Sequence, residues 1–137
     1  MADRLQFEVV SPERLLLSRS VDMVVVPGAE GDFGALPGHA LFLSALRPGV
    51  IAVFEGSTVA DRIFIAGGFA EVTETGCTVL ADEAVALADL DRGRVEADIA
   101  EARADIEDAK TDAERLAGER RLAIAEAKAA ALEGAPY

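Results

Sequence analysis

The feature that most constrains the fold of this chain is an abrupt change of composition near residue 90. All six Phe, nine of the twelve Gly and four of the five Pro come before Asp89, whereas fourteen Ala and twenty charged residues lie in residues 91–137. Gly, Pro and aromatic residues at short intervals are typical of strands and turns, and long runs of Ala, Glu and Arg favour helix. We therefore expect a mainly β part over residues 1–88, followed by an α-helical part over residues 89–137.

The first part consists of short apolar stretches separated by turn residues. Their spacing leaves no room for helices of ten or more residues between them, so a sandwich or barrel is favoured over βαβ units. Leu5, Phe7 and Val9 alternate with polar residues and would share one face of a strand. We expect an N-terminal antiparallel β-sandwich with strands at 5–10, 15–18, 23–26, 40–46, 50–54, 62–66, 69–73 and 78–81.

The second part carries start signals for two helices. Asp91 is a suitable N-cap, and Thr111 with Glu114 has the spacing of a capping box, so a break is expected near Lys110 and a second helix to about Leu132. Apolar residues at spacings of three and four form a seam along the first helix: Val95, Ile99, Ala102, Ile106 and Ala109. In the second helix, Leu116 and Ile124 form an apolar stripe. These signals predict a C-terminal α-helical hairpin. Because alanine dominates its apolar faces and buries little area, the hairpin should have a weak core of its own.

Composition disfavours several classes of function. The formal net charge of −12 argues against a nucleic-acid partner, since proteins that bind the phosphate backbone carry clustered Lys and Arg. No apolar run approaches the roughly 18 to 20 residues of a membrane span, and no signal sequence precedes the first strand, so we expect neither direct membrane insertion nor export. The single cysteine, Cys77, cannot form an intrachain disulfide and is expected to be a buried structural thiol.

Few residues are candidates for catalysis. The Gly-rich stretch 28–38 contains no lysine, which excludes a P-loop. His39 has no partner His or Cys at ligand spacing, so we interpret it as a turn residue or an interface contact rather than a catalytic base. Glu30 and Asp32 could serve as paired acids, but without a nucleophile or metal ligand beside them a partner-facing loop is favoured. We expect no catalytic residues, no metal site and a binding or mechanical role.

Three stretches of the sequence resemble the epsilon family of ATP synthase subunits. They are Val24–Val50, Phe64–Ala84 and Leu90–Arg94. Within them, the family's elements occur in its order and spacing: Glu-Gly-x-x-Gly followed by Pro-Gly-His at 30–39, Gly-Gly-Phe-x-Glu-Val at 67–72 and Val-Leu-Ala-Asp at 79–82. The resemblance covers essentially the whole chain and is stronger in the β part than in the helical part.

The resemblance implies a non-catalytic subunit of a proton-translocating F-type ATP synthase, at the cytoplasmic face of a bacterial membrane. In such a complex the sandwich docks on the gamma subunit, at the foot of the central stalk, and on the membrane ring of c subunits. The subunit thereby couples the catalytic head to that ring and turns with it. The family's acidic loop faces the ring, so the resemblance identifies Asp32, and with it Glu30 and His39, as predicted c-ring contacts.

The resemblance also implies two properties of the hairpin. In many members it reaches the alpha and beta subunits of the catalytic head and restrains ATP hydrolysis. Here the second helix carries four basic residues against five acidic ones between 111 and 133, so we expect weak or no inhibition. In some members ATP holds the hairpin folded, through a motif that Leu90, Asp91 and Arg94 match, although Val95 replaces the family's Ala. Asp91 is thus either an ATP contact or a plain N-cap, and the alternative function is a free-standing ATP-sensing regulatory protein.

Overall fold

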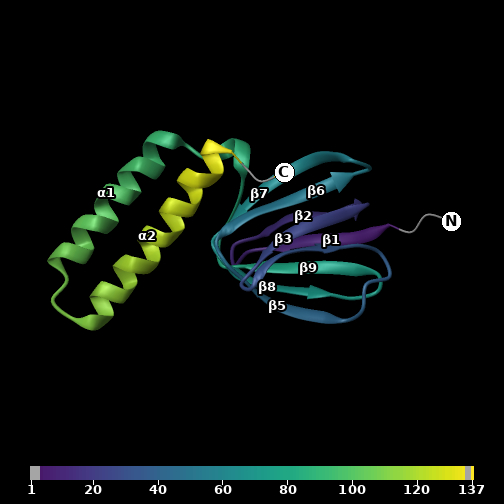
Figure 1. The fold of residues 1–137 in the computed structure, drawn as a ribbon, viewed down its shortest axis with the longest axis horizontal. Helices are drawn as coiled ribbons and strands as arrows, with labels where there is room; N and C mark the ends of the chain where they lie inside the picture. The colour runs from purple at the N-terminus through teal and green to yellow at the C-terminus, as the bar shows by residue number, and fades with distance from the viewer. Residues whose placement is uncertain (1–3, 135–136) are drawn as a thin grey trace. The chain divides into compact units, whose positions relative to one another are not determined.

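The computed structural model describes residues 4–134 and residue 137. These residues form two compact units, one that runs to Ala88 and includes Tyr137, and one that begins at Asp89. The boundary falls where the composition changes. Figure 1 shows strands alone in the first unit, apart from a short turn of helix at its end, and two antiparallel helices in the second.

The first unit is a β-sandwich built from one continuous sheet that folds over on itself. Its strands in the described part of the chain are β1 (Leu5–Val10), β2 (Leu15–Val21), β3 (Met23–Gly28), β4 (Gly31–Ala35), β5 (Phe42–Leu46), β6 (Gly49–Glu55), β7 (Thr58–Ile65), β8 (Gly68–Val72), β9 (Gly76–Ala81) and β10 (Ala84–Ala86). Their order in the sheet is β10-β7-β6-β3-β5-β8-β9-β1-β2, and β4 pairs with β3. Residues from both halves of the sheet meet in a single apolar core.

Alternation along the strands places the core as the sequence predicts. Leu5, Phe7 and Val9 are completely buried, while Gln6 and Glu8 between them point outward. The same period of two separates buried from exposed residues in β8 and β9. The prediction of a sandwich followed by a helical hairpin is therefore confirmed.

Three details of the sheet differ from the expectation. The sequence pattern predicts no strand at β4, which is rich in glycine, yet β4 pairs along its whole length with β3. β10 has only three residues and is defined by its pairing with β7. β1 and β9 are parallel, although the expected arrangement is antiparallel. Each difference depends on pairing with a strand elsewhere in the chain, and tertiary pairing overrides local preference in sheets.

The second unit is the hairpin of α1 (Arg92–Asp108) and α2 (Asp112–Glu133), preceded by a short 3-10 turn, η1 (Leu87–Asp89). Both predicted caps are present. Asp91 accepts hydrogen bonds from the backbone N–H groups of Gly93 and Arg94, and the Thr111 hydroxyl accepts one from the N–H of Glu114. The Glu114 carboxylate accepts the backbone N–H of Lys110, one residue earlier than in an ideal capping box.

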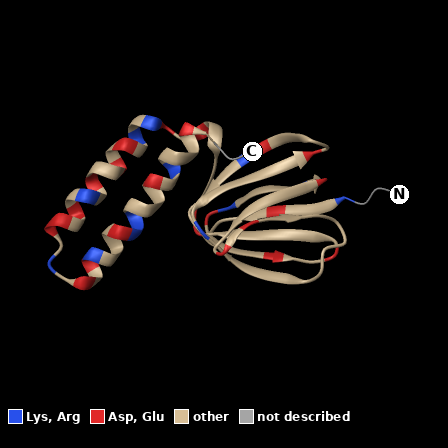
Figure 2. Cartoon of the chain, viewed as in Figure 1, with Lys and Arg blue, Asp and Glu red and all other residues tan. Residues whose placement is uncertain are grey.

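Small residues let the two helices approach each other closely. Gly118 is buried in α2, and a Cβ at this position would lie 2.8 Å from Cγ1 of Ile106 in α1. Ala102 of the predicted seam is buried, whereas Leu116, which the pattern places on an apolar stripe of the second helix, is 52% exposed. Charged residues occupy both helices along their length (Figure 2). Neither described helix is long and apolar enough to cross a membrane.

Candidate interaction surface

The predicted acidic loop is a tight turn between β3 and β4. Gly28 pairs directly with Gly31, so Ala29 and Glu30 alone make the connection. Both glycines are required by the geometry. A Cβ on Gly28 would lie 2.5 Å from the carbonyl oxygen of Gly31, and Gly31 has φ 144°, which side chains disfavour. Glu30 is therefore presented on an exposed, sterically defined turn.

Asp32 is fixed by the connection between β5 and β6. The Arg47 guanidinium donates to one carboxylate oxygen of Asp32 and to the carbonyl of Gly28, and the Arg47 backbone N–H donates to the carbonyl of Pro27 at 2.9 Å. The N–H of Ala29 also donates to the carbonyl of Ala45 in β5, at 2.9 Å. These bonds hold the acidic turn against β5 and fix the position of the Asp32 carboxylate before any partner binds.

His39 lies in a different place from the acidic turn. It belongs to the connection between β4 and β5, so β4 separates it in the chain from Glu30. Its backbone N–H donates to Leu36 in a turn, and its Nδ1 lies 2.6 Å from the carbonyl of Ala40. The structure places His39 in a turn, and it does not bring His39 together with Glu30 and Asp32 into one cluster.

An exposed row of apolar side chains crosses the outer face of the sheet. The register pairs its members in sequence from β5 to β2, and we call them the apolar row: Ala45, Phe69, Leu80, Val10 and Leu15. Phe69, Leu80 and Leu15 are each more than half exposed. Leu43, beside the row on β5, is 69% exposed.

Monomeric proteins rarely leave large apolar side chains adjacent to one another in water, so the apolar row is typical of a protein interaction site. The row is not among the sites predicted from the sequence. A signal was present, because Phe69 and Leu80 occupy the outward positions of strands whose other outward residues, Glu71 and Thr78, are polar. Recognising the row as continuous required the pairing of β9 with β1, which the local sequence does not reveal.

The predicted nucleotide-binding residues lie at the start of α1. Oδ1 of Asp91 accepts the N–H groups of Gly93 at 2.9 Å and Arg94 at 3.4 Å, so this carboxylate is used as a cap. The Arg94 side chain is 77% exposed and bonds to Asp98 one turn later, at 3.2 Å. Leu90 is half-buried. Whether these residues also contact ATP stays a prediction.

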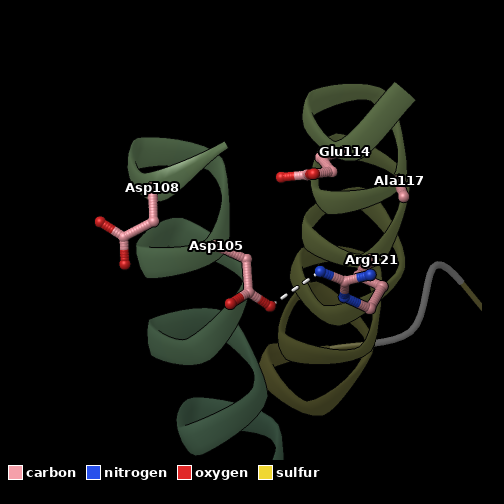
Figure 3. A pocket seen from close by; sticks show the side chains of 5 residues that line it. All are labelled: Asp105, Asp108, Glu114, Ala117 and Arg121. Atoms are coloured by element: carbon pink, nitrogen blue, oxygen red, sulfur yellow. Dashed lines mark hydrogen bonds and ion pairs between the residues drawn. The ribbon is translucent and has the colours of Figure 1, made fainter. Parts of the chain in front are cut away.

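A hollow of about 270 Å³ lies between the helices close to the hairpin turn (Figure 3). Asp105, Asp108 and Glu114 line it with Ala117 and Arg121, and Arg121 bonds to Asp105 at 2.8 Å. Three carboxylates against one guanidinium leave the lining negatively charged. This hollow is therefore a poor site for a phosphate group, and none of the predicted nucleotide residues lines it.

Possible metal ligands and the Cys77 thiol are the other candidates for reactivity among the described residues. No group of three or more His, Cys, Asp or Glu in residues 4–134 and 137 is arranged to hold a metal ion. Cys77 is completely buried, as expected, and burial raises the pKa of its thiol to about 12. A thiol with such a pKa stays protonated near neutral pH and is a weak nucleophile.

Comparison with known proteins gives two family matches. The family described as ATP synthase, Delta/Epsilon chain, beta-sandwich domain matches residues 4–87, and the family of the C-terminal domain of the ATP synthase epsilon chain matches residues 91–136. The ATP synthase epsilon chain of Rhodospirillum rubrum is 54% identical over 134 residues, which covers 98% of this chain and 100% of the relative. That of Paramagnetospirillum magneticum is 50% identical over 132 residues, with 96% and 99% covered.

Two solved structures share the fold. One polypeptide in the structure of the Euglena gracilis mitochondrial ATP synthase, OSCP/F1/c-ring in rotational state 1, superposes with a TM-score of 0.81 at 29% identity, covering 94% of this chain and 81% of that one. One polypeptide in the central stalk/c-ring structure of the Tetrahymena thermophila mitochondrial ATP synthase has a TM-score of 0.65 at 19% identity, with 93% and 95% covered. The second likeness is one of fold alone.

Proposed function

This chain belongs to the ATP synthase epsilon chain family, and from that premise we propose that it couples the catalytic head to the membrane ring as part of the central stalk. The sandwich is the docking unit: the apolar row binds the gamma subunit, and the acidic turn meets the c-ring. A subunit with this role is non-catalytic, and it associates peripherally with the membrane through its partners. We expect it at the cytoplasmic face of a bacterial cell membrane.

The observation that carries the proposal is the exposed apolar row beside the braced acidic turn. Phe69 and Leu80 are more than half exposed in the isolated protein, and burying the remaining exposed surface of each against a partner contributes about 1 to 1.5 kcal/mol, roughly half of the value for complete burial. Ala45, the first member of the row, receives the hydrogen bond from Ala29 of the turn. Strand β5 thus connects the apolar row to the acidic turn. Together they suit a partner whose surface is apolar where it meets the row and polar where it meets the turn.

The acidic turn has a different physical role from the apolar row. Exposed ion pairs contribute only about 0 to 1 kcal/mol, so Glu30 and Asp32 add little to the affinity. Charges at the edge of an interface instead fix its register and reject wrong partners. We therefore assign the turn to correct seating on the c-ring. His39 stays a predicted contact, which would require a partner that also reaches the connection between β4 and β5.

Binding to purified gamma subunit tests the proposal. Leu80→Glu places a charge in the middle of the apolar row and should weaken binding at least tenfold, since tenfold corresponds to about 1.4 kcal/mol. Thr78→Glu is the matched control, because it adds the same charge to the outer face of the same strand, in the neighbouring row. Equal affinity of the two variants would remove the apolar row from the interface. Circular dichroism spectra would verify that both variants are folded.

We further propose that the hairpin restrains ATP hydrolysis weakly or not at all. The support is the charge of α2, in which five acidic residues outnumber four basic ones, and the acidic lining near the hairpin turn. The test is ATP hydrolysis by the isolated catalytic head with and without the full-length protein. We expect less than about a twofold change, equivalent to under ~0.5 kcal/mol. A several-fold decrease on adding the protein would contradict this part of the proposal.

A further inference from the structure

Tyr137 follows the hairpin in sequence but clusters with the residues of the sandwich. Its phenol donates a hydrogen bond to Oδ2 of Asp32 in β4, at 3.0 Å. Its backbone carbonyl accepts one from Nε of Arg62 in β7, at 2.9 Å. Its ring meets that of Phe54 in β6 edge to face, with centroids 6.3 Å apart and an interplanar angle of 71°. Three strands of the sandwich therefore contact one residue.

These contacts are chemically matched to a tyrosine. The Asp32 carboxylate accepts the hydroxyl proton, the Phe54 ring offers an aromatic edge or face, and the Arg62 guanidinium satisfies the backbone carbonyl. Phenylalanine would keep the ring contact and lose the hydrogen bond, whereas serine would keep neither. The acceptor is also held in place beforehand, because Arg47 bonds to the other oxygen of Asp32.

The net effect of the surroundings of the phenol is to favour its protonated form. Asp32 is the nearest, and its hydrogen bond raises the pKa of Tyr137 above the ordinary value, while the positive charge of Arg47 opposes this effect. Arg62 contributes a second guanidinium from β7, bonded to the backbone of the same residue. Deprotonation would destroy the donor and place a second negative charge beside Asp32, so docking and protonation support each other.

We propose that the outer face of β4, β6 and β7 is a docking site for Tyr137, and that this docking competes with the membrane-ring partner for the carboxylate of Asp32. Arg47 bonds to one oxygen of that carboxylate and Tyr137 to the other, and the Asp32 side chain is only 27% exposed, so a partner's donor reaches it most directly by replacing the tyrosine hydroxyl. Glu30 stays exposed on the turn and available in both states. The competition rests on the proposed function, because it requires Asp32 to be a partner contact. The docking of Tyr137 on the sandwich does not depend on the proposed function.

The docking can be measured in the isolated full-length protein, because Tyr137 is its one tyrosine and there is no tryptophan. Alkaline titration followed by phenolate absorbance therefore reports on this residue alone. We expect Asp32→Asn to lower the pKa of Tyr137, since the variant loses the carboxylate and leaves Arg47 beside the phenol. Glu71→Gln, on the outer face of β8, is the control and should leave the titration unchanged. Identical titrations of Asp32→Asn and the unmodified protein would overturn the docking site.

Tyr137→Phe tests the competition, because it removes only the hydroxyl that occupies Asp32. Its affinity for the c-ring complex should rise about three- to tenfold, the range expected when one exposed hydrogen bond of ordinary strength no longer has to be broken. Unchanged affinity would overturn the competition. If neither form binds the complex, the proposed function fails and the competition with it, while the titration still decides whether Tyr137 docks.

Discussion

The sandwich and the hairpin of this protein are stabilised in different ways. The sandwich buries large side chains completely, among them Phe7, Ile51 and Phe64, and several of its strands pair with distant parts of the sequence, as β1 does with β9 and β5 with β8. The hairpin buries mainly Ala102, Gly118 and other small residues, and its contacts are between helices adjacent in the sequence. We infer that the sandwich is a stiff platform for partners, and that the hairpin opens at a much lower free energy.

The two units also differ in how many charged residues they contain for their length. Residues 1–90 contain 13 acidic and 5 basic residues, and residues 91–137 contain 12 acidic and 8 basic ones. The hairpin has mixed charges along its helices, whereas the charges of the sandwich gather mostly near the strand ends (Figure 2). On the outer face of the sheet, the apolar row contains no charged residue. The proposed partner-binding surface thus belongs to the unit in which charge is sparse, and the loosely packed helix pair to the unit in which charge is dense.

The largest effect is expected from a cavity in the sandwich core. Phe7→Ala should lower the free energy of unfolding of the sandwich by about 3 to 5 kcal/mol, because Phe7 is completely buried at the centre of β1. Cys77 provides the measurement. It is the only cysteine and is fully buried, so its rate of labelling by a thiol reagent reports opening of the sandwich. Unchanged labelling in Phe7→Ala would contradict the view of a single tightly packed core.

A smaller effect is expected from removing the first cap of the hairpin. Asp91→Ala should destabilise α1 by about 1 kcal/mol, since two backbone N–H groups lose their acceptor. Asp91→Asn keeps a capping oxygen and should retain most of that stability. Amide hydrogen exchange in α1 measures both variants. If Asp91→Asn destabilises α1 as much as Asp91→Ala does, the negative charge of Asp91 stabilises the helix in addition to its capping hydrogen bonds.

The same residues decide the ATP-sensing alternative. Isothermal titration of the full-length protein with ATP should give no binding near micromolar affinity, because the Asp91 carboxylate caps α1 and Arg94 bonds to Asp98. Micromolar binding that is lost in Arg94→Ala would restore the alternative. Arg103→Ala serves as the matched control, since it removes another exposed guanidinium of the same helix.

Packing between the helices is expected to have a still smaller net effect. Gly118→Ala gains helix propensity worth about 1 kcal/mol but forces Cγ1 of Ile106 to move, so the hairpin should lose about 0.5 to 1 kcal/mol overall. Gly93→Ala makes the same substitution at the start of α1, where the nearest atom to the new Cβ is a side-chain oxygen 3.4 Å away, and should stabilise the hairpin. Thermal melting followed at the helical circular dichroism band compares the two. Cys77 labelling should be unaffected by either.

The smallest effect concerns the pH dependence of the sandwich. The backbone N–H of Gly56 and the guanidinium of Arg4 hold the pKa of Asp22 below its usual value. A depressed pKa in the folded state adds stability above the unfolded-state value, near 3.8, and this contribution is lost as the pH falls through the folded-state pKa. When the pH is lowered from neutral to below the folded-state pKa of Asp22, the melting temperature of Asp22→Asn should therefore fall by less than that of the unmodified protein. An equal loss would assign the acid sensitivity to other carboxylates.

Local signals predicted those parts of the structure that depend on neighbouring residues. The caps at Asp91 and Thr111 and the alternation of Leu5, Phe7 and Val9 are local, and each is present as expected. β4 was missed because Gly31 and Gly34 are typical of loops until β3 supplies their pairing. The resemblance to the epsilon family was decisive for function, because composition and spacing alone indicate only a binding or mechanical role.

The candidate site was predicted less well than the fold. Glu30 lies in an exposed turn and Asp32 in the adjoining strand β4, and their functional role stays a prediction. The apolar row and the docking of Tyr137 both join side chains from strands that are far apart in sequence, and no periodicity within one segment encodes such a meeting. Leu116 illustrates the reverse error, since an apolar residue at helical spacing is expected to be covered and this one is exposed.

The parallel pairing of β1 with β9 also affects when the sheet can form during translation. β1 leaves the ribosome early, but Gly76–Ala81 must be translated before its second neighbour exists. At about 5 to 20 residues per second, several seconds pass during which the edge of β1 that later pairs with β9 is unpaired. An unpaired strand edge of this kind is prone to aggregation until its partner strand arrives. The helices emerge last, so the hairpin folds only after the sandwich has been completed.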